Sequence, residues 1–434
     1  MRIAGTLLAG LVVALILFTD IIAAWIGSLE GAEAAGVMRS VREAVLLLMA
    51  AGGAVAALAS GLLRARDLFG VAYGMLVAAY SAAYLFEGYG ASGGLASMGL
   101  LLLPLIFVYG GYLLAIMGVN RRHLAIMIVV AAFASMSFGF WEIERTEFWT
   151  DTIKFPDYLR DVKGVVLGFE PTTGLPWNFF RSDVDDRRAA GLLASPLAQG
   201  PVLVIAAILC LIMLRAHPAW RVLLAGALLY GAVQSETRAA ILVFLLFILL
   251  ASFLFGAKRI LASSYALLLW GAAVFFFRHQ IQSALDLTDG STSGHVAGLL
   301  MHLQDLNQVL LLGAGLGTQG AIAGQEGRIL IGGGESALFS IIYQVGGIGG
   351  ILFCLFYAAV VRELLGSGAI EADEENEKRR KEHAMIAMMG LAMAANLLIS
   401  EYLLTISGAG LLWLLLGYFQ ASARQARRQA ETSL

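Results

Sequence analysis

Runs of apolar residues alternate with polar connections along most of the chain. A helix needs about 20 predominantly apolar residues to cross a bilayer, and about twelve segments approach that length. The predicted spans cover 4–27, 44–63, 67–87, 95–118, 123–141, 197–215, 217–235, 238–256, 260–277, 336–361, 384–403 and 405–422. The pattern therefore predicts an all-α, polytopic integral membrane protein with about 12 transmembrane helices.

The composition supports this class. Of 434 residues, 59% are hydrophobic and 14% are charged. A soluble protein of this length needs far more polar surface. The first apolar run is long enough to span and no clear cleavage site follows it, so we expect a retained helix. Cys210 and Cys354 lie within apolar runs, which favours core positions over a disulfide or a metal pair.

Basic residues predict the orientation, because short cytoplasmic connections carry an excess of Lys and Arg. If Met1 is cytoplasmic, four basic pairs fall on the cytoplasmic side, namely Arg64/Arg66, Arg121/Arg122, Arg215/Arg221 and Lys258/Arg259. Both termini are then cytoplasmic. The basic C-terminal tail is expected to anchor this topology, with contact to anionic lipid as the alternative.

Two long polar loops divide the spans into groups. Five spans lie in 1–141, a loop in 142–196, four spans in 197–277, a second loop in 278–335, and three spans in 336–434 with a charged cytoplasmic loop at 362–383. In the predicted orientation both long loops lie outside the cytoplasm. Long loops in a membrane protein usually carry function, so we expect an extracytoplasmic active site.

Three arginines precede the sixth span in the segment FFRSDVDDRRAAG, at Arg181, Arg187 and Arg188. A guanidinium group binds phosphate oxygens through paired, fixed donors. The alternative is neutralisation by the aspartates of the same segment, Asp183, Asp185 and Asp186. Arg238 begins the eighth span, where the free N–H groups and the dipole of a helix N-terminus also attract anions. We predict a pyrophosphate site there, the alternative being an arginine that reaches lipid headgroups.

The second loop has three parts. Apolar residues at helical spacing predict an amphipathic helix at 293–312, with His295 and His302 on one face. Two histidines do not make a metal site, so no metal is expected. The glycines of GAGLGTQG at 313–320 follow no predicted strand, which argues against a dinucleotide fingerprint and favours flexibility or close backbone approach to a ligand.

Glu335 and Ser336 stand at the outer mouth of the tenth span. Glu335 could act as general base on a sugar hydroxyl. Equally, the two residues could simply begin the helix, where serine and carboxylates are favoured. Asp20 and Glu401 are ionisable residues in or beside predicted spans, and we expect each to pair with a basic group inside the bundle.

At these positions the chain resembles the O-antigen ligase and O-antigen polymerase family of bacterial polysaccharide assembly. RRAAGLLASP resembles the family's Arg-x-x-Gly element, and ETRAAIL resembles its Ser-Arg-Gly-like helix start. VLLLGAGLG resembles its glycine-repeat segment, and ESALFSIIYQVGGIGGILF its last junction between outer loop and helix. The resemblance covers roughly 180–360, and the rest of the chain by topology alone.

Family members are similar to GT-C-type glycosyltransferases, which take a glycan from undecaprenyl pyrophosphate at the periplasmic side. The resemblance implies that Arg188 and Arg238 bind the donor pyrophosphate and that residue 335 lies near the acceptor hydroxyl. Ligases usually carry His at this junction, whereas many polymerases show Glu-Ser, as here. A further family arginine is expected where this chain has His295.

The resemblance thus implies an inverting, metal-independent glycosyltransferase of the bacterial inner membrane that polymerises repeat units and needs no cofactor. Catalytic Glu335 and Arg238 would be surrounded by the substrate-binding residues Arg181, Arg187, Arg188, His295, His302 and Ser336. The implied partners are the carrier-linked donor and acceptor glycans, membrane lipids, and a chain-length regulator or flippase, but no nucleic acid. Two alternatives stay open: a ligase acting on lipid A-core or protein, and a transporter with a midplane site in broken helices.

Overall fold

The computed structural model describes most of residues 2–433. Outside the described residues lie 1, 87–90, 166–167, 182–185, 255–258, 277, 279–281, 283–285, 287–289, 320–335, 367–373, 399 and 434. Some side chains within helices, including that of His295, also lie outside them. The predicted general base Glu335 and the predicted phosphate-binding side chain of His295 are therefore not placed.

The described part of the chain is built from helices and contains no β-strand, only isolated bridges within loop 142–196. The helices are α1 (Arg2–Glu30), α2 (Ala32–Ala59), α3 (Leu68–Phe86), α4 (Ala91–Ile116), α5 (Arg121–Glu142), α6 (Phe155–Asp157), α7 (Pro196–Met213), α8 (Pro218–Gln234), α9 (Arg238–Ser252), α10 (Arg259–Phe276), α12 (Gly290–Val309), α14 (Ala337–Leu365), α15 (Glu374–Ala394) and α16 (Ile406–Ser433). The predicted all-α class is confirmed, and α12 coincides with the predicted amphipathic helix.

Seven helices of the described part are long and apolar enough to cross a membrane. They cover Arg2–Glu30, Ala32–Ala59, Ala96–Ile116, Arg121–Glu142, Pro196–Met213, Ala337–Leu365 and Ile406–Thr432. Each overlaps a predicted span. The remaining predicted spans fall on α3, α8, α9, α10 and α15, of which α8 and α9 have only 17 and 15 residues. The total of about twelve spans stays a prediction.

The span predicted at 384–403 is not one continuous helix in the structure. The apolar run 384–403 was expected to be one helix, but α15 ends at Ala394 and short 3₁₀ turns follow at Ala395–Leu397 and Glu401–Leu404. The hydroxyl of Ser400 accepts a hydrogen bond from the backbone N–H of Tyr402 and caps the second turn. Such side-chain capping competes with a continuous helix, and hydropathy alone does not detect it.

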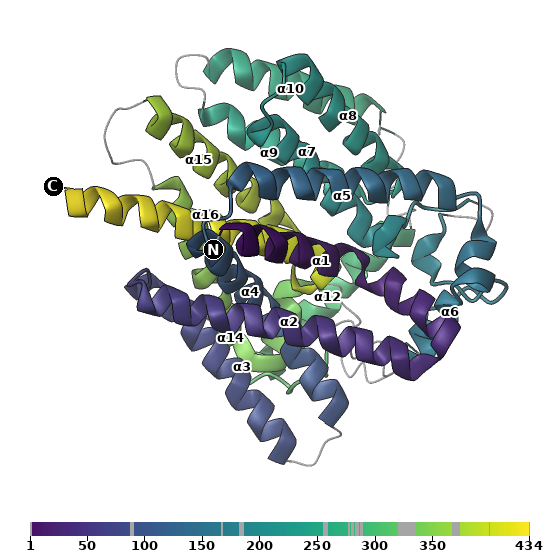
Figure 1. The fold of residues 1–434 in the computed structure, drawn as a ribbon. Helices are drawn as coiled ribbons and strands as arrows, with labels where there is room; N and C mark the ends of the chain where they lie inside the picture. Colours follow the sequence, from purple (N-terminus) through teal and green to yellow (C-terminus); the bar gives the residue numbers. More distant parts are fainter. Residues whose placement is uncertain are drawn as a thin grey trace.

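Helix α4 packs closely against both α2 and α16. A Cβ added at Gly111 of α4 would clash with the backbone of Leu414 and Tyr418 in α16, and one at Gly417 would clash with Val108. Glycine at these positions lets two helix backbones approach closely, which strengthens van der Waals packing where lipid supplies no hydrophobic drive. In Figure 1, α1 and α5 run side by side along this core toward loop 142–196.

Loop 142–196 forms a folded layer at one end of the bundle. Its core is aromatic, with ring centroids of Trp149 5.2 Å from Phe155 and 5.4 Å from Phe179. The layer is joined to α1 through Asp20, whose carboxylate accepts hydrogen bonds from Lys163 Nζ at 2.8 Å and from the Tyr158 hydroxyl at 2.9 Å. The predicted pairing of Asp20 is confirmed. We call this end, with loop 142–196 and the turn between α8 and α9, the loop end.

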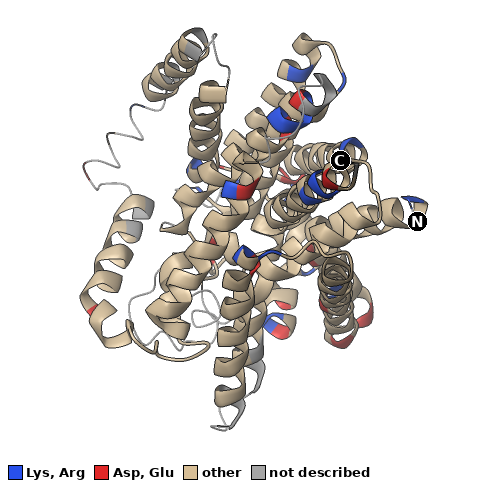
Figure 2. Ribbon diagram, turned by 90° about the vertical axis from the view of Figure 1, so that its left-hand side faces the viewer, with Lys and Arg blue, Asp and Glu red and all other residues tan. Residues whose placement is uncertain are grey.

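The opposite end holds the C terminus (Figure 2). A buried arginine, Arg424, joins its elements. Arg424 of α16 donates to Asp67 at 2.6 Å, to Glu363 at 2.8 Å and to the carbonyl of Leu62 at 2.8 Å. It thereby fixes α16 to α14 and to the connection between α2 and α3. This arginine of the basic tail is 2% exposed, so it does not contact lipid headgroups. We call this the terminal end.

Helix α14 is broken inside the bundle. Val345 has φ −128° and Gly346 has φ 78° and ψ 170°, a conformation that essentially only glycine adopts. The glycine segment after α12 fills the break, because Ala314 N donates to Tyr343 O at 2.6 Å and Gly347 N donates to Leu310 O at 2.7 Å. A Cβ at Gly313 would lie 2.7 Å from Gly346 N. The glycine segment therefore lies close to the backbone of α14. Its predicted approach to a ligand stays a prediction.

Replacing Gly346 by Ala should destabilise the protein, because the new Cβ meets the Leu311 carbonyl and the backbone conformation is strained. Strain of this kind costs about 1–3 kcal/mol before any clash. The matched control is Gly99→Ala in α4, where a Cβ meets nothing within 4 Å. Thermal unfolding in detergent should show a clear loss for Gly346→Ala and none for the control; equal melting temperatures would contradict the break.

Candidate functional site

Arg188 lies at the loop end beside the turn from α8 to α9. Its backbone N–H donates to Phe179 O at 2.9 Å, and the next residue donates from Ala189 N to Gln234 O at 3.0 Å. Its side chain donates from Nε to Ser235 O at 3.1 Å and from Nη2 to Glu236 O at 3.1 Å. Backbone carbonyls therefore hold the guanidinium in place, and its Nη1 makes no bond within the described residues.

The turn that receives Arg188 also begins α9. Glu236 has φ 50°, a left-handed conformation unusual for a residue with a side chain. The hydroxyl of Thr237 donates to Pro196 O at 2.9 Å and ties the turn to the start of α7. Arg238 is the first residue of α9 and is exposed. The dipole at this helix start favours an anion. Two of its first N–H groups are already used, because Arg238 N donates to Glu236 O at 3.1 Å and Ala240 N donates to Thr237 O at 2.9 Å.

Arg181 joins the same cluster but is partly neutralised. It forms ion pairs with Asp186 at 3.3 Å and with Glu236 at 3.2 Å. Neutralisation of the arginines by neighbouring aspartates was the alternative interpretation of this segment. Among the described residues it applies to Arg181, which Asp186 neutralises. Asp183 and Asp185 lie outside the described residues.

Charges of both signs act on Arg188. Burial lowers the pKa of its guanidinium, Glu236 opposes that shift, and the charges of Arg238 and Arg181 lower the pKa further. Arg188 makes no ion pair with a described carboxylate, whereas Arg181 makes two. An incoming dianion would relieve both the desolvation and the mutual repulsion. The structure thus brings together three of the predicted site residues, Arg181, Arg188 and Arg238.

Arg187 has a different place from its neighbour. It is 3% exposed, and its Nη2 lies 2.9 Å from the carboxylate of Glu142, which is fully buried. Its Nη1 donates to Thr146 at 2.9 Å, and its guanidinium lies over the ring of Phe179. Burial lowers the pKa of Arg187, and the Glu142 charge raises it. Arg187 is thus enclosed and paired inside the loop core, so its position gives no support to the predicted role in substrate binding.

His302 and Ser336 also have structural positions. The His302 ring stacks on Phe339 with centroids 4.9 Å apart, and burial lowers its pKa. The Ser336 hydroxyl accepts from Phe339 N at 3.3 Å and donates to Leu397 O at 2.9 Å. Ser336 therefore caps α14, which was the structural alternative to a role in substrate binding. The described contacts of both residues are with α12, α14, Gln319 of the glycine segment and the turn after α15, and not with the arginines.

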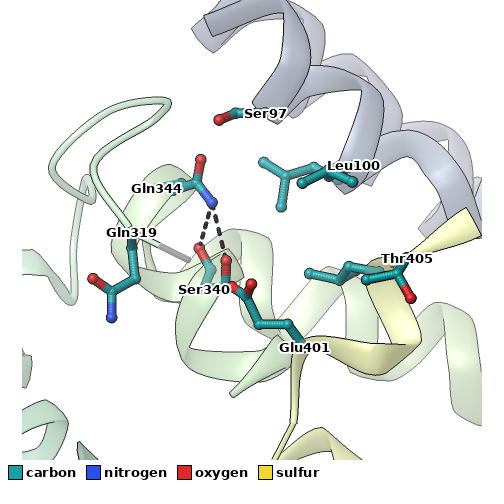
Figure 3. Close-up of a pocket in the computed structure, with 9 residues that line it drawn as sticks. Ser97, Leu100, Gln319, Ser340, Gln344, Glu401 and Thr405 are labelled. Carbon is teal, nitrogen blue, oxygen red and sulfur yellow. Dashed lines mark hydrogen bonds between the residues drawn. The ribbon is translucent and has the colours of Figure 1, made fainter. Parts of the chain in front are cut away.

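A second polar site lies beside the break in α14 (Figure 3). Gln344 donates to the backbone and hydroxyl oxygens of Ser340 at 3.1 Å and accepts from Gly317 N at 3.0 Å. These groups, with Ser97 and Glu401, line a cavity of about 10 Å³. That volume suits roughly one water molecule. None of the described lining residues is basic.

Apart from Glu401, the residues of this second site were not predicted from the sequence. They come from α4, the glycine segment, α14 and the segment 401–405, so no local spacing connects them. The only local signal was the spacing of Ser340 and Gln344, which is one helical turn.

Comparison with known protein families finds no match for the chain, and comparison with curated proteins finds none either.

The buried pair of Glu142 and Arg187 can be tested by a double-mutant cycle. Glu142→Gln or Arg187→Met alone should each cost about 3–5 kcal/mol, because each leaves an unpaired buried charge. The double variant should lose less than the sum, which is the signature of direct coupling. The surface pair control Arg160→Gln should cost at most about 1 kcal/mol. The measurement is thermal or denaturant unfolding in detergent, and strict additivity of the two variants would contradict the pairing.

Proposed function

We propose that this membrane protein is a metal-independent glycosyltransferase that acts on glycans linked to a polyprenyl pyrophosphate, and that it polymerises oligosaccharide repeat units. The observation that supports the proposal is the cluster of Arg188, Arg238 and Arg181 at the start of α9. A pyrophosphate leaving group carries the charge that such a cluster would stabilise.

The reaction would proceed in one displacement. The acceptor hydroxyl oxygen bonds to the anomeric carbon of the donor as the bond from that carbon to the pyrophosphate oxygen breaks, which inverts the configuration. Negative charge develops on the departing pyrophosphate, and Arg188 and Arg238 would stabilise it. Donors fixed before the reaction contribute most, and the two carbonyls that orient Arg188 provide such fixation.

The proton of the acceptor hydroxyl needs a base. We assign that role to Glu335 on the sequence resemblance. It precedes Ser336, the residue that caps α14. Ser336 is buried and bonded to Leu397 O, so it does not compete for the proton.

Arg188→Ala and Arg238→Ala should each lower the rate of polymerisation about 10²–10³-fold, the usual effect of removing one charge-stabilising donor. Arg188→Lys should rescue little, because a lysine cannot donate to both carbonyls and to an anion in one plane. The matched control is Arg160→Ala in the same loop, whose exposed side chain pairs with Asp157. The measurement is polysaccharide chain length in cells, together with turnover by purified protein on carrier-linked repeats.

Each variant must first be shown to insert at wild-type amount. Unchanged chain length in inserted Arg238→Ala would refute the proposal. The polysaccharide made by a strain that lacks the gene distinguishes a polymerase from a ligase. Lipid A-core that carries a single repeat indicates a lost polymerase. Bare lipid A-core together with carrier-linked polymer indicates a lost ligase.

The broken helix α14 with its polar cavity supports a second candidate, a transporter. Secondary transporters bind substrates and ions at interrupted helices deep in the membrane. The cavity of about 10 Å³ is far below the several hundred Å³ of a small-molecule site, so it could serve a proton or water but not a sugar. Size therefore favours chemistry at the loop end.

Glu401→Gln separates the two candidates. A glycosyltransferase with its site at the arginines should keep chain length within about twofold of wild type, since Glu401 lines the cavity beside α14 and not the arginine cluster. That figure corresponds to about 0.4 kcal/mol of barrier. A proton-coupled transporter should instead lose activity in Glu401→Gln and retain it in Arg188→Ala. Measuring both variants in the same cells decides between them.

A further inference from the structure

The terminal end contains an open pocket of about 690 Å³ that is rich in arginine. Four arginines line it, Arg64, Arg66, Arg362 and Arg427, together with the carboxylate of Glu363. They come from the connection between α2 and α3, from the last turn of α14 and from the C-terminal part of α16. Figure 2 looks onto this end and shows Lys and Arg on several neighbouring elements.

The carboxylates near the pocket are already occupied. Glu363 accepts from Arg424 Nε and from Gln420, each at 2.8 Å, and lies 3.4 Å from Arg64. Asp67 accepts from Arg424 at 2.6 Å. Two acids therefore balance Arg424 and Arg64, and this network contributes no net charge to the pocket.

The other three arginines lack a direct partner in the described part. Arg66, Arg362 and Arg427 make no ion pair and no side-chain hydrogen bond there, although the charge of Glu363 favours the charged form of Arg427. Arg66 and Arg362 are exposed, whereas Arg427 is half-buried and its Nη2 is closed off from solvent without a hydrogen-bond partner. A buried donor without a partner is costly, and three like charges around one pocket repel one another. An anion in the pocket would relieve both costs.

The chemistry of the lining selects a phosphate group. Guanidinium groups bind phosphate oxygens in pairs, and three of them can surround one tetrahedral anion. Beside Arg66, α3 begins with an exposed apolar face formed by Leu68, Val71 and Met75. Their spacing places them on one side of the helix, along which an acyl chain could lie. Basic pockets between helix ends are known binding places for anionic lipid headgroups.

We propose that this pocket binds a phosphate group, and that the phosphate belongs to an anionic phospholipid whose acyl chain lies along α3. The bound headgroup would connect the α2–α3 connection, α14 and α16 beside the Arg424 network. This site lies at the opposite end from the proposed glycosyl transfer and does not depend on it.

The test is ligand-dependent thermal unfolding of the full chain in a neutral detergent. Phosphatidylglycerol should raise the melting temperature saturably, and phosphatidylcholine at the same concentration should not. The double variant Arg66→Gln/Arg362→Gln should need at least about tenfold more phosphatidylglycerol for the same shift, equivalent to 1.4 kcal/mol of binding. Neither residue belongs to the Arg424 network, so the variant should fold.

Arg380→Gln is the matched control, because Arg380 is an exposed arginine of α15 outside the pocket lining. It should behave as wild type. If inorganic phosphate alone gives the shift and phosphatidylglycerol adds nothing, the phosphate site holds and the lipid source is wrong. If phosphatidylglycerol shifts the wild type and the double variant equally, or if neither ligand shifts the wild type, the proposal is overturned.

Discussion

The buried carboxylate of Glu142 is the contact on which the loop end depends. It accepts a hydrogen bond from Trp149 Nε1 at 2.6 Å, from Arg187 Nη2 at 2.9 Å and from Ala190 N at 2.7 Å. These donors come from both ends of loop 142–196, so one side chain at the end of α5 closes the whole loop. A buried charge is tolerated only when it is fully paired, so the loss of any one of these donors would destabilise the loop. Arg188 follows Arg187 directly, so the contact between Arg187 and Glu142 also determines where Arg188 lies.

Much of the fold could be predicted because its causes are local. Apolar runs of bilayer length predicted the helices, and the helical spacing of 293–312 predicted α12. Asp20 was expected to pair because an isolated charge beside a span is too costly, and it does pair. Arg188 was expected just before the sixth span and Arg238 at the start of the eighth, and only the family resemblance joined them at one pyrophosphate. The structure places both near the turn between α8 and α9.

What the sequence could not predict depends on contacts between distant segments. Arg187 and Arg188 are adjacent and chemically identical, yet one is enclosed by Glu142 and the other faces the α8–α9 turn. No spacing rule distinguishes them, because the difference arises from the path of the folded loop. The break at Gly346 was hidden for the same reason. Glycines within an apolar run are also typical of ordinary helix packing, and only the partner segment after α12 shows that the helix is interrupted.

The manner in which α14 is broken has a consequence for motion. Its interrupted backbone groups are paired with Leu310 and Ala314, and the Tyr343 hydroxyl donates to His302 O at 2.7 Å. If α12 moved along α14, these hydrogen bonds would break. Inside a bilayer no water is present to replace the lost partners. Helices α12 and α14 are therefore expected to move together. A displacement of α12 at the surface would be carried into the interior of the bundle, to the place where Gln344 and Ser340 line the polar cavity.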